Sequence, residues 1–180
     1  MQKDNYALLG ILGPLTAIIF IAASILLSPW FRWETNALSD LGNSVGSDTA
    51  SIFNLGLLLT GFLTIIYSMT SFMKHAKFTS YVLTLTGFSL QLVGAFDEVY
   101  GMLHTQISVL FFATLALASI SYMIEKRSLL AGLALIVGLA SWILYGLEVY
   151  SAGIAVPEAI SSMATATWVV LSAFRIYLNK

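Results

Sequence analysis

The residues best suited to chemistry lie in the polar stretch 94–104, which separates two long apolar runs. Glu98 is followed six positions later by His104, one of only two histidines in the 180 residues. Carboxyl and imidazole groups are common general acids and bases, and both also bind cations. Asp40, in an earlier polar connection, adds a second carboxyl group. Asp40, Glu98 and His104 are therefore the candidate catalytic residues.

The rest of the chain has the composition of a membrane protein. It is 58% hydrophobic and 9% charged, whereas soluble domains are about 25% charged. The net charge of -1 argues against nucleic acid as a partner, because a phosphate-binding surface needs clustered Lys and Arg. The absence of cysteine excludes disulfides, thiolate metal sites and cysteine nucleophiles.

The lengths of the apolar runs predict how the chain crosses the bilayer. A spanning helix needs about 20 apolar residues, and six such segments with short loops account for the whole chain. We therefore expect an all-α polytopic membrane protein in which residues 1–180 form one six-helix bundle. The expected helices cover about 6–28, 49–73, 80–100, 104–124, 128–150 and 157–178.

The charges predict the orientation of this bundle. With six spans both termini lie on one side, and that side carries Lys3, Lys74, Lys77, Lys126, Arg127, Arg175 and Lys180. Basic residues favour the cytoplasmic side, so we expect cytoplasmic N and C termini and insertion in the plasma membrane. Most acidic residues fall on the opposite, outer side: Glu34, Asp40, Asp48, Asp97, Glu98, Glu148 and Glu158.

Three of the expected helices carry a stripe of small and polar residues that ends in a carboxyl group. Such a stripe on an apolar spanning helix faces other helices, because small residues permit close approach and polar groups find partners there. The first stripe comprises Thr84, Gly87, Gln91, Gly94 and Glu98. The second comprises Gly138, Ser141, Tyr145 and Glu148, and the third Glu158, Ser161, Ser162 and Thr165.

The stripes predict an acidic cup that opens on the outer side and is floored by Gln91, Ser141, Tyr145 and Thr165. Burial and mutual repulsion should raise the pKa values of its carboxyl groups. We expect its ligand-binding residues to be Ser39, Asp40, Asn54, Gln91, Asp97, Glu98, His104, Tyr145, Glu148 and Glu158. The alternative is that acids at helix ends are simply solvated, or that Glu158 complements its helix N-terminus.

A metal ion is weakly indicated, and no cofactor is expected. One histidine with several carboxylates suits a hard cation or a mixed zinc site, but no spacing such as H-E-x-x-H is present. His75 lies between Lys74 and Lys77 on the cytoplasmic side, away from the other candidates.

Three functions remain open from the residues alone. The first is binding of a membrane lipid head group, or of a small polar or cationic ligand, because interfacial Trp30 and Trp33 lie beside the cup. The second is an intramembrane lipid hydrolase or transferase, with or without a metal. The third is a proton- or cation-coupled carrier, although carriers usually have a midplane site. Oligomeric state cannot be read from the sequence.

Nearly the whole chain resembles a mostly archaeal family of small membrane proteins catalogued as domain of unknown function 998. The residues that carry the resemblance are the run from Asn36 to Gly42, Phe53-Asn54, Gly94-x-Phe-x-Glu98, His104, and Phe111-Phe112. It implies a six-helix fold and brings no established activity.

The chain is more loosely similar to two eukaryotic groups. These are the Frag1/DRAM/Sfk1 proteins, associated with lipid handling, and the alkaline ceramidases and adiponectin-type receptors. The latter use an Asp and three His around zinc, and this chain matches them only at Ser39, Asp40 and His104.

Overall fold

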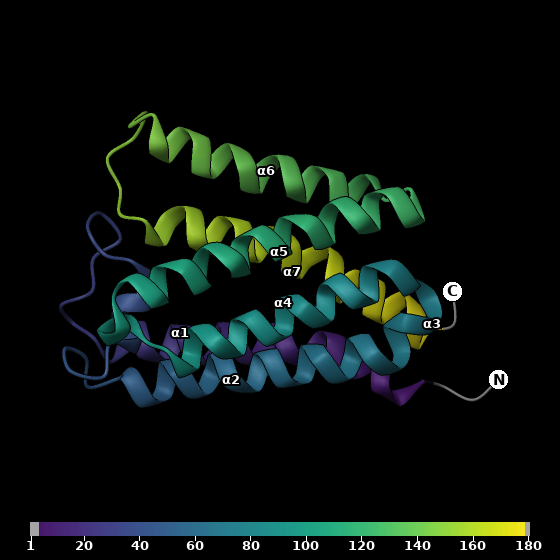
Figure 1. Ribbon diagram of the computed structural model, residues 1–180, viewed down its shortest axis with the longest axis horizontal. Coiled ribbons are helices and arrows are strands. Elements are labelled where there is room, and N and C mark those ends of the chain that lie inside the picture. The colour runs from purple at the N-terminus through teal and green to yellow at the C-terminus, as the bar shows by residue number, and fades with distance from the viewer. Residues whose placement is uncertain (1–3, 179–180) are drawn as a thin grey trace.

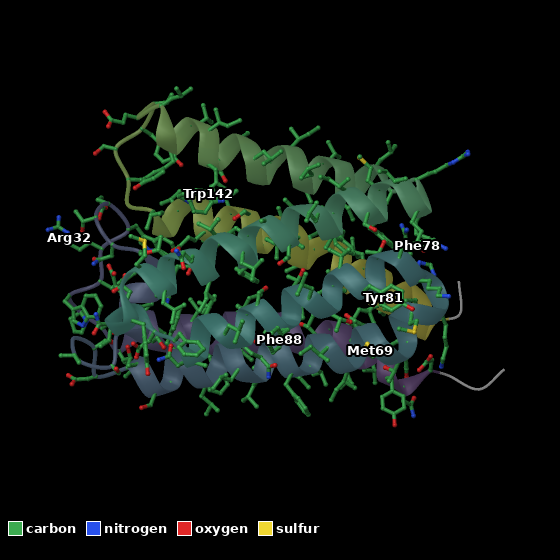
Figure 2. All side chains as sticks on the ribbon, in the orientation of Figure 1. Arg32, Met69, Phe78, Tyr81, Phe88 and Trp142 are labelled. Carbon is green, nitrogen blue, oxygen red and sulfur yellow. The ribbon has the colours of Figure 1, made fainter. Side chains whose placement is uncertain are left out.

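A computed structural model describes residues 4–178, and the regular structure in this range is entirely helical (Figure 1). Six of its helical segments are long and apolar enough to cross a membrane: Asn5–Leu26, Ala50–His75, Lys77–Ala95, Met102–Lys126, Leu129–Gly146 and Ala155–Tyr177. The predicted all-α fold with six spanning helices is therefore confirmed. Apolar side chains cover much of the outside of the bundle, where lipid would contact them (Figure 2).

The spanning segments correspond to the main helices as follows. The first consists of a 3-10 turn, η1 (Asn5–Leu8), and α1 (Leu9–Leu26). The second is α2 (Ala50–Tyr67), a π-helical turn η3 (Ser68–Phe72) and α3 (Met73–His75). The others are α4 (Lys77–Ala95), α5 (Met102–Lys126), α6 (Leu129–Gly146) and α7 (Ala155–Tyr177).

Both described chain ends lie at the same end of the bundle, which we call the terminal end (Figure 1). The opposite, loop end carries the connections 27–49, 96–101 and 147–154. The first contains the 3-10 helix η2 (Leu38–Gly42), and the second contains η4 (Glu98–Tyr100). Helices α1, α2, α4 and α5 pack side by side in that order, and α6 packs mainly against α7 at the edge (Figure 1).

An aromatic core fills the terminal end. Trp168 is 1% exposed and stacks on Tyr122, with ring centroids 4.7 Å apart. Its indole Nε1–H donates to the hydroxyl of Ser119 at 3.1 Å. Phe72 and Tyr67 complete the cluster. These residues join α2, η3, α5 and α7.

Glycines permit a close approach of helices α2 and α4. A Cβ on Gly61 would overlap the backbone carbonyl oxygen of Gly87, and a Cβ on Gly87 would lie 2.9 Å from the carbonyl oxygen of Gly61. The two backbones therefore touch, as small residues allow in membrane helix packing.

Two helices end earlier than the sequence indicates. α4 stops at Ala95 rather than near residue 100, because the chain becomes extended at Asp97. The Asp97 carboxylate then accepts from the backbone N–H of Val99 at 3.0 Å and caps η4. Similarly, α6 ends at Gly146 rather than near residue 150, and Glu148 follows in the left-handed region with φ of 54°.

Candidate functional site

Three carboxyl groups from separate elements gather at the loop end, and we call them the carboxyl cluster: Asp40 of η2, Glu98 of η4 and Glu158 of α7. The side chains of Asp40 and Glu98 lie close enough together for the carboxyl group of Asp40 to raise the pKa of Glu98. Asp40 and Glu98 are also close enough to act electrostatically on Glu158. The structure thus brings together residues separated by up to 118 positions in the chain.

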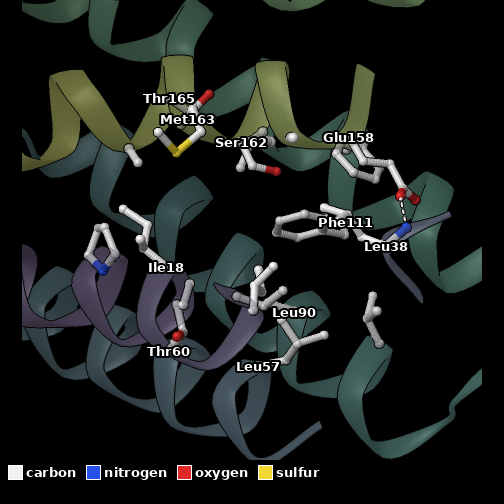
Figure 3. Close-up of a pocket in the computed structure, with 18 of the residues that line it drawn as sticks. Ile18, Leu38, Leu57, Thr60, Leu90, Phe111, Glu158, Ser162, Met163 and Thr165 are labelled. Carbon is white, nitrogen blue, oxygen red and sulfur yellow. Dashed lines mark hydrogen bonds between the residues drawn. The ribbon is translucent and has the colours of Figure 1, made fainter. Parts of the chain in front are cut away.

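The chain around η2 supplies most of the hydrogen bonds that position the cluster. Asp40 Oδ2 accepts from the Asn36 side-chain amide at 2.7 Å and from the Ala37 backbone N–H at 3.0 Å. Glu158 Oε2 accepts from the Leu38 backbone N–H at 2.8 Å, which fastens η2 to the start of α7 (Figure 3).

Glu98 is held less tightly than the other two members. Its carboxyl oxygens accept from the hydroxyl of Ser39 and the side-chain amide of Asn43, each at 3.4 Å. Burial raises the pKa of Glu98 above its ordinary value, and the neighbouring carboxyl group of Asp40 raises this pKa further. The charge of Glu98 therefore depends on its surroundings.

This raised pKa gives a sign for the pH dependence of stability. A folded-state pKa above the ordinary 4.5 contributes stability below pH 4.5, and this contribution is lost as pH rises through the folded value. Glu98→Gln cannot ionise and escapes that loss. We expect the melting temperature of the variant minus that of the wild type to increase by about 2 °C when the pH is raised from 4.5 to 7.5. The increase is small because solvent screens the charge of a half-exposed carboxyl group.

Thermal unfolding followed by tryptophan fluorescence would measure this difference, with the exposed Glu148→Gln as the matched control. If the melting temperature of Glu98→Gln falls relative to that of the wild type over the same pH interval, the raised pKa of Glu98 is contradicted.

Three other predicted site residues surround the cluster with their polar groups already bonded. Asp97 accepts from the backbone N–H of Ser44 at 3.2 Å. The side-chain amide of Asn54 donates to the carbonyl of Gly42 at 2.8 Å. The ring nitrogens of His104 bond the carbonyl of Phe96 at 2.7 Å and the hydroxyl of Ser108 at 3.3 Å. These contacts fix the loops around the cluster.

The structure places the remaining predicted site residues elsewhere. The side-chain amide of Gln91 donates to the carbonyl of Leu58 in the α2–α4 contact. Tyr145 and Glu148 line a separate hollow at the end of α6 with Tyr150 and Ser151. They stand apart because α6 packs on the far side of α7 and α5. The carboxyl groups gathered at the loop end therefore include those of the first and third stripes and do not include Glu148 of the second.

A second, mostly apolar cavity extends from the carboxyl cluster into the bundle. Its volume is about 330 Å³, and its walls are mostly aliphatic and aromatic side chains of α1, α2, α4, α5 and α7. Ser39 and Glu158 line its loop end, while Ser162 and Thr165 follow along α7. Figure 3 shows Ile18 and Leu57 across the cavity from α7. No residue of α6 lines it.

This cavity opens sideways between α1 and α7. Ile18 and Met163 both line it and are nevertheless 42% and 54% exposed. The two helices meet near the terminal end, where a Cβ on Gly10 would lie 2.8 Å from the Cβ of Ala173. At the loop end, the backbone N–H groups of Gly153 and Ala155 donate to the carbonyls of Trp33 and Asn36. The opening lies between these closures, within the membrane-spanning segments.

Sequence reasoning missed most of this cavity. Polarity and helical phase identified Ser39, Glu158 and Thr165. The apolar wall of the cavity, however, carries no sequence signal that distinguishes it from a lipid-facing surface. Pro14 and Ile18 of α1 illustrate this, since α1 is uncharged and apolar along its whole length. Which apolar residues enclose a space depends on how the helices cross.

Within residues 4–178, no group of three or more His, Asp or Glu side chains is arranged to hold a metal ion. His104 contributes both ring nitrogens to other contacts, and His75 bonds the hydroxyl of Tyr122 at 3.2 Å near the terminal end. The arrangement therefore offers carboxyl acceptors and one buried apolar space.

These features define the class of the protein: a multi-pass membrane protein with a laterally open apolar cavity that ends at the buried carboxyl group of Glu158. The chain belongs to the DUF998 family, described as a protein of unknown function, whose family model matches residues 11–175. Comparisons with curated proteins and with solved structures found no match.

Proposed function

We propose that this protein binds a membrane amphiphile, with its hydrocarbon chain in the cavity and its polar head at the carboxyl cluster. The single observation that carries the proposal is that one continuous space has apolar walls along its length and Glu158 with Ser39 at its loop end. Binding sites for small molecules have this composition, with mostly apolar walls and a few polar groups that fix orientation.

The lateral opening supports entry from the bilayer rather than from water. An amphiphile within a leaflet already has its chain at the depth of Ile18 and Met163, so it could enter between α1 and α7 without exposing the chain to water. The basic residues near the terminal end favour a cytoplasmic position for that end in the plasma membrane. The carboxyl cluster would then face the outer leaflet.

A substitution that fills the cavity would test this proposal. Ala166 lines the cavity on α7, and Ala113 of α5 is exposed and does not line it. We expect Ala166→Trp to reduce binding of decanol to the protein in lipid nanodiscs at least tenfold, because the indole ring takes up space that the chain needs. The matched Ala113→Trp variant should bind as the wild type does.

Native mass spectrometry of protein released from the nanodiscs would count bound decanol, and lipid extracted from the purified protein would identify any natural ligand. Equal decanol binding by the wild type and Ala166→Trp would refute the cavity as the binding site.

Acid–base chemistry on the bound head group is a second candidate function. It is favoured by the closeness of Asp40 to Glu98, because two neighbouring carboxyl groups can serve as a general acid and a general base. Both groups neighbour Glu158, which lines the cavity. Incubation of the wild type with extracted membrane lipids should then yield a cleaved or transferred head group that Glu98→Gln does not produce.

A further inference from the structure

We propose that the occupant of this cavity is a single-chain amphiphile with a protonated amine head. This inference rests on the proposed function and specifies the ligand's class. The structure juxtaposes two features that select such a molecule: carboxyl groups that have no lysine or arginine partner among residues 4–178 at the loop end of the cavity, and an apolar volume that holds one chain.

The head group must be a hydrogen-bond donor, because the cavity offers carboxyl oxygens that accept no hydrogen bond from the protein's described residues. Of the two carboxyl oxygens of Glu158, Oε2 accepts from Leu38, whereas Oε1 has no hydrogen bond from residues 4–178. The Ser162 hydroxyl, one helical turn along α7 and also lining the cavity, makes no hydrogen bond within this range either. An ammonium group has three donors and no acceptor, and therefore complements these oxygens.

The charges at the loop end also favour a cationic head group. Among residues 4–178, the basic residues at the loop end are Arg32, whose side chain is 72% exposed and lies 4.0 Å from Glu34, and His104, whose ring nitrogens bond the carbonyl of Phe96 and the hydroxyl of Ser108. The carboxyl cluster thus has no lysine or arginine partner among these residues, and a buried carboxylate without a partner is costly. An anionic head, such as a carboxylate or phosphate, would add repulsion to that cost. A cationic head would remove that cost by pairing with the carboxylate.

The volume limits the number of chains. Since a water molecule occupies about 30 Å³ in the liquid and a methylene group is of similar size, 330 Å³ accommodates roughly ten methylene groups. That is one chain of moderate length, or the head-proximal part of a longer one whose end emerges between Ile18 and Met163. The second chain of a two-chain lipid would have to lie outside the cavity.

Three probes that share one ten-carbon chain separate the contribution of the head from that of the chain. Decylamine, decanol and decanoate would each be bound to the wild-type protein in phosphatidylcholine nanodiscs at pH 7.5, with partition into empty nanodiscs subtracted. We expect decylamine to bind at least tenfold more tightly than decanol, and decanoate to bind most weakly. Similar affinities for the three probes, or a preference for decanoate, would overturn the inference while leaving chain binding intact.

The matched variant is Glu158→Gln, whose amide oxygen can still accept from the Leu38 N–H. We expect it to weaken decylamine binding about tenfold and to change decanol binding less than threefold. Decanol binding thereby reports an intact fold and an open cavity. If Glu158→Gln also loses decanol, Glu98→Gln decides: a selective loss of decylamine supports the inference, and an unchanged preference for decylamine overturns it.

Failure of the proposed function gives a different result. In that case none of the three probes would exceed its partition into empty nanodiscs, or Ala166→Trp would leave all three affinities unchanged.

Discussion

Gly61→Ala is expected to destabilise the protein by about 2 kcal/mol, although alanine favours helices by about 1 kcal/mol over glycine. The added Cβ would overlap the carbonyl oxygen of Gly87 and would also lie 2.5 Å from Cγ of Gln91. Backbone cannot rotate away as a side chain can, so α2 and α4 must separate. Gly87 lines the cavity, and the separation should therefore also disturb ligand binding.

Gly146→Ala is the matched control, because a Cβ on Gly146 meets no atom within 4 Å. Thermal unfolding in nanodiscs should show a lower melting temperature for Gly61→Ala and no loss for Gly146→Ala. If the two variants unfold at the same temperature, the α2–α4 contact is looser than described.

Trp168→Ala is expected to cost about 3 kcal/mol, the lower end of the range for removing a large buried aromatic side chain. The lower end applies because lipid is as apolar as the bundle interior, which weakens the solvent-transfer contribution. The loss then comes from unfilled space, from the stacking on Tyr122 and from the hydrogen bond to Ser119. Val169, the next residue along α7, lines the cavity, so the packing of Trp168 also supports the cavity wall.

Trp168→Phe would separate the two contributions, because phenylalanine keeps an aromatic ring and removes the indole N–H. We expect it to recover at least half of the lost stability. Trp142→Phe is the comparison at a partly buried tryptophan, whose Nε1–H donates to Ser161 at 3.3 Å, and it should cost less than Trp168→Ala. A melting temperature of Trp168→Ala equal to that of the wild type would show that α7 is not anchored by this residue.

The candidate site was partly predictable because polar residues are conspicuous in an apolar chain. Ser39, Asp40, Glu98 and Glu158 were all proposed from residue type and helical phase, and the structure brings them together at the loop end. The stripe ending in Glu148 carried the same pattern. It lies apart because helical phase tells which residues share a face and does not tell which helix that face meets.

The sequence by itself determined the class of the protein. Runs of about 20 apolar residues can satisfy their backbone groups in lipid only as helices, so six such runs define the spans without reference to tertiary contacts. Family membership likewise follows from the sequence, over residues 11–175.

Tertiary structure alone decided which apolar residues enclose the cavity and which carboxyl groups meet. α1 and α7 close on one another at Gly10 and Ala173 and diverge toward Ile18 and Met163. That divergence depends on helix crossing and on how η2 is bound to α7. The apolar side chains that face the cavity are chemically the same as those that face lipid, so only the arrangement of the helices distinguishes them.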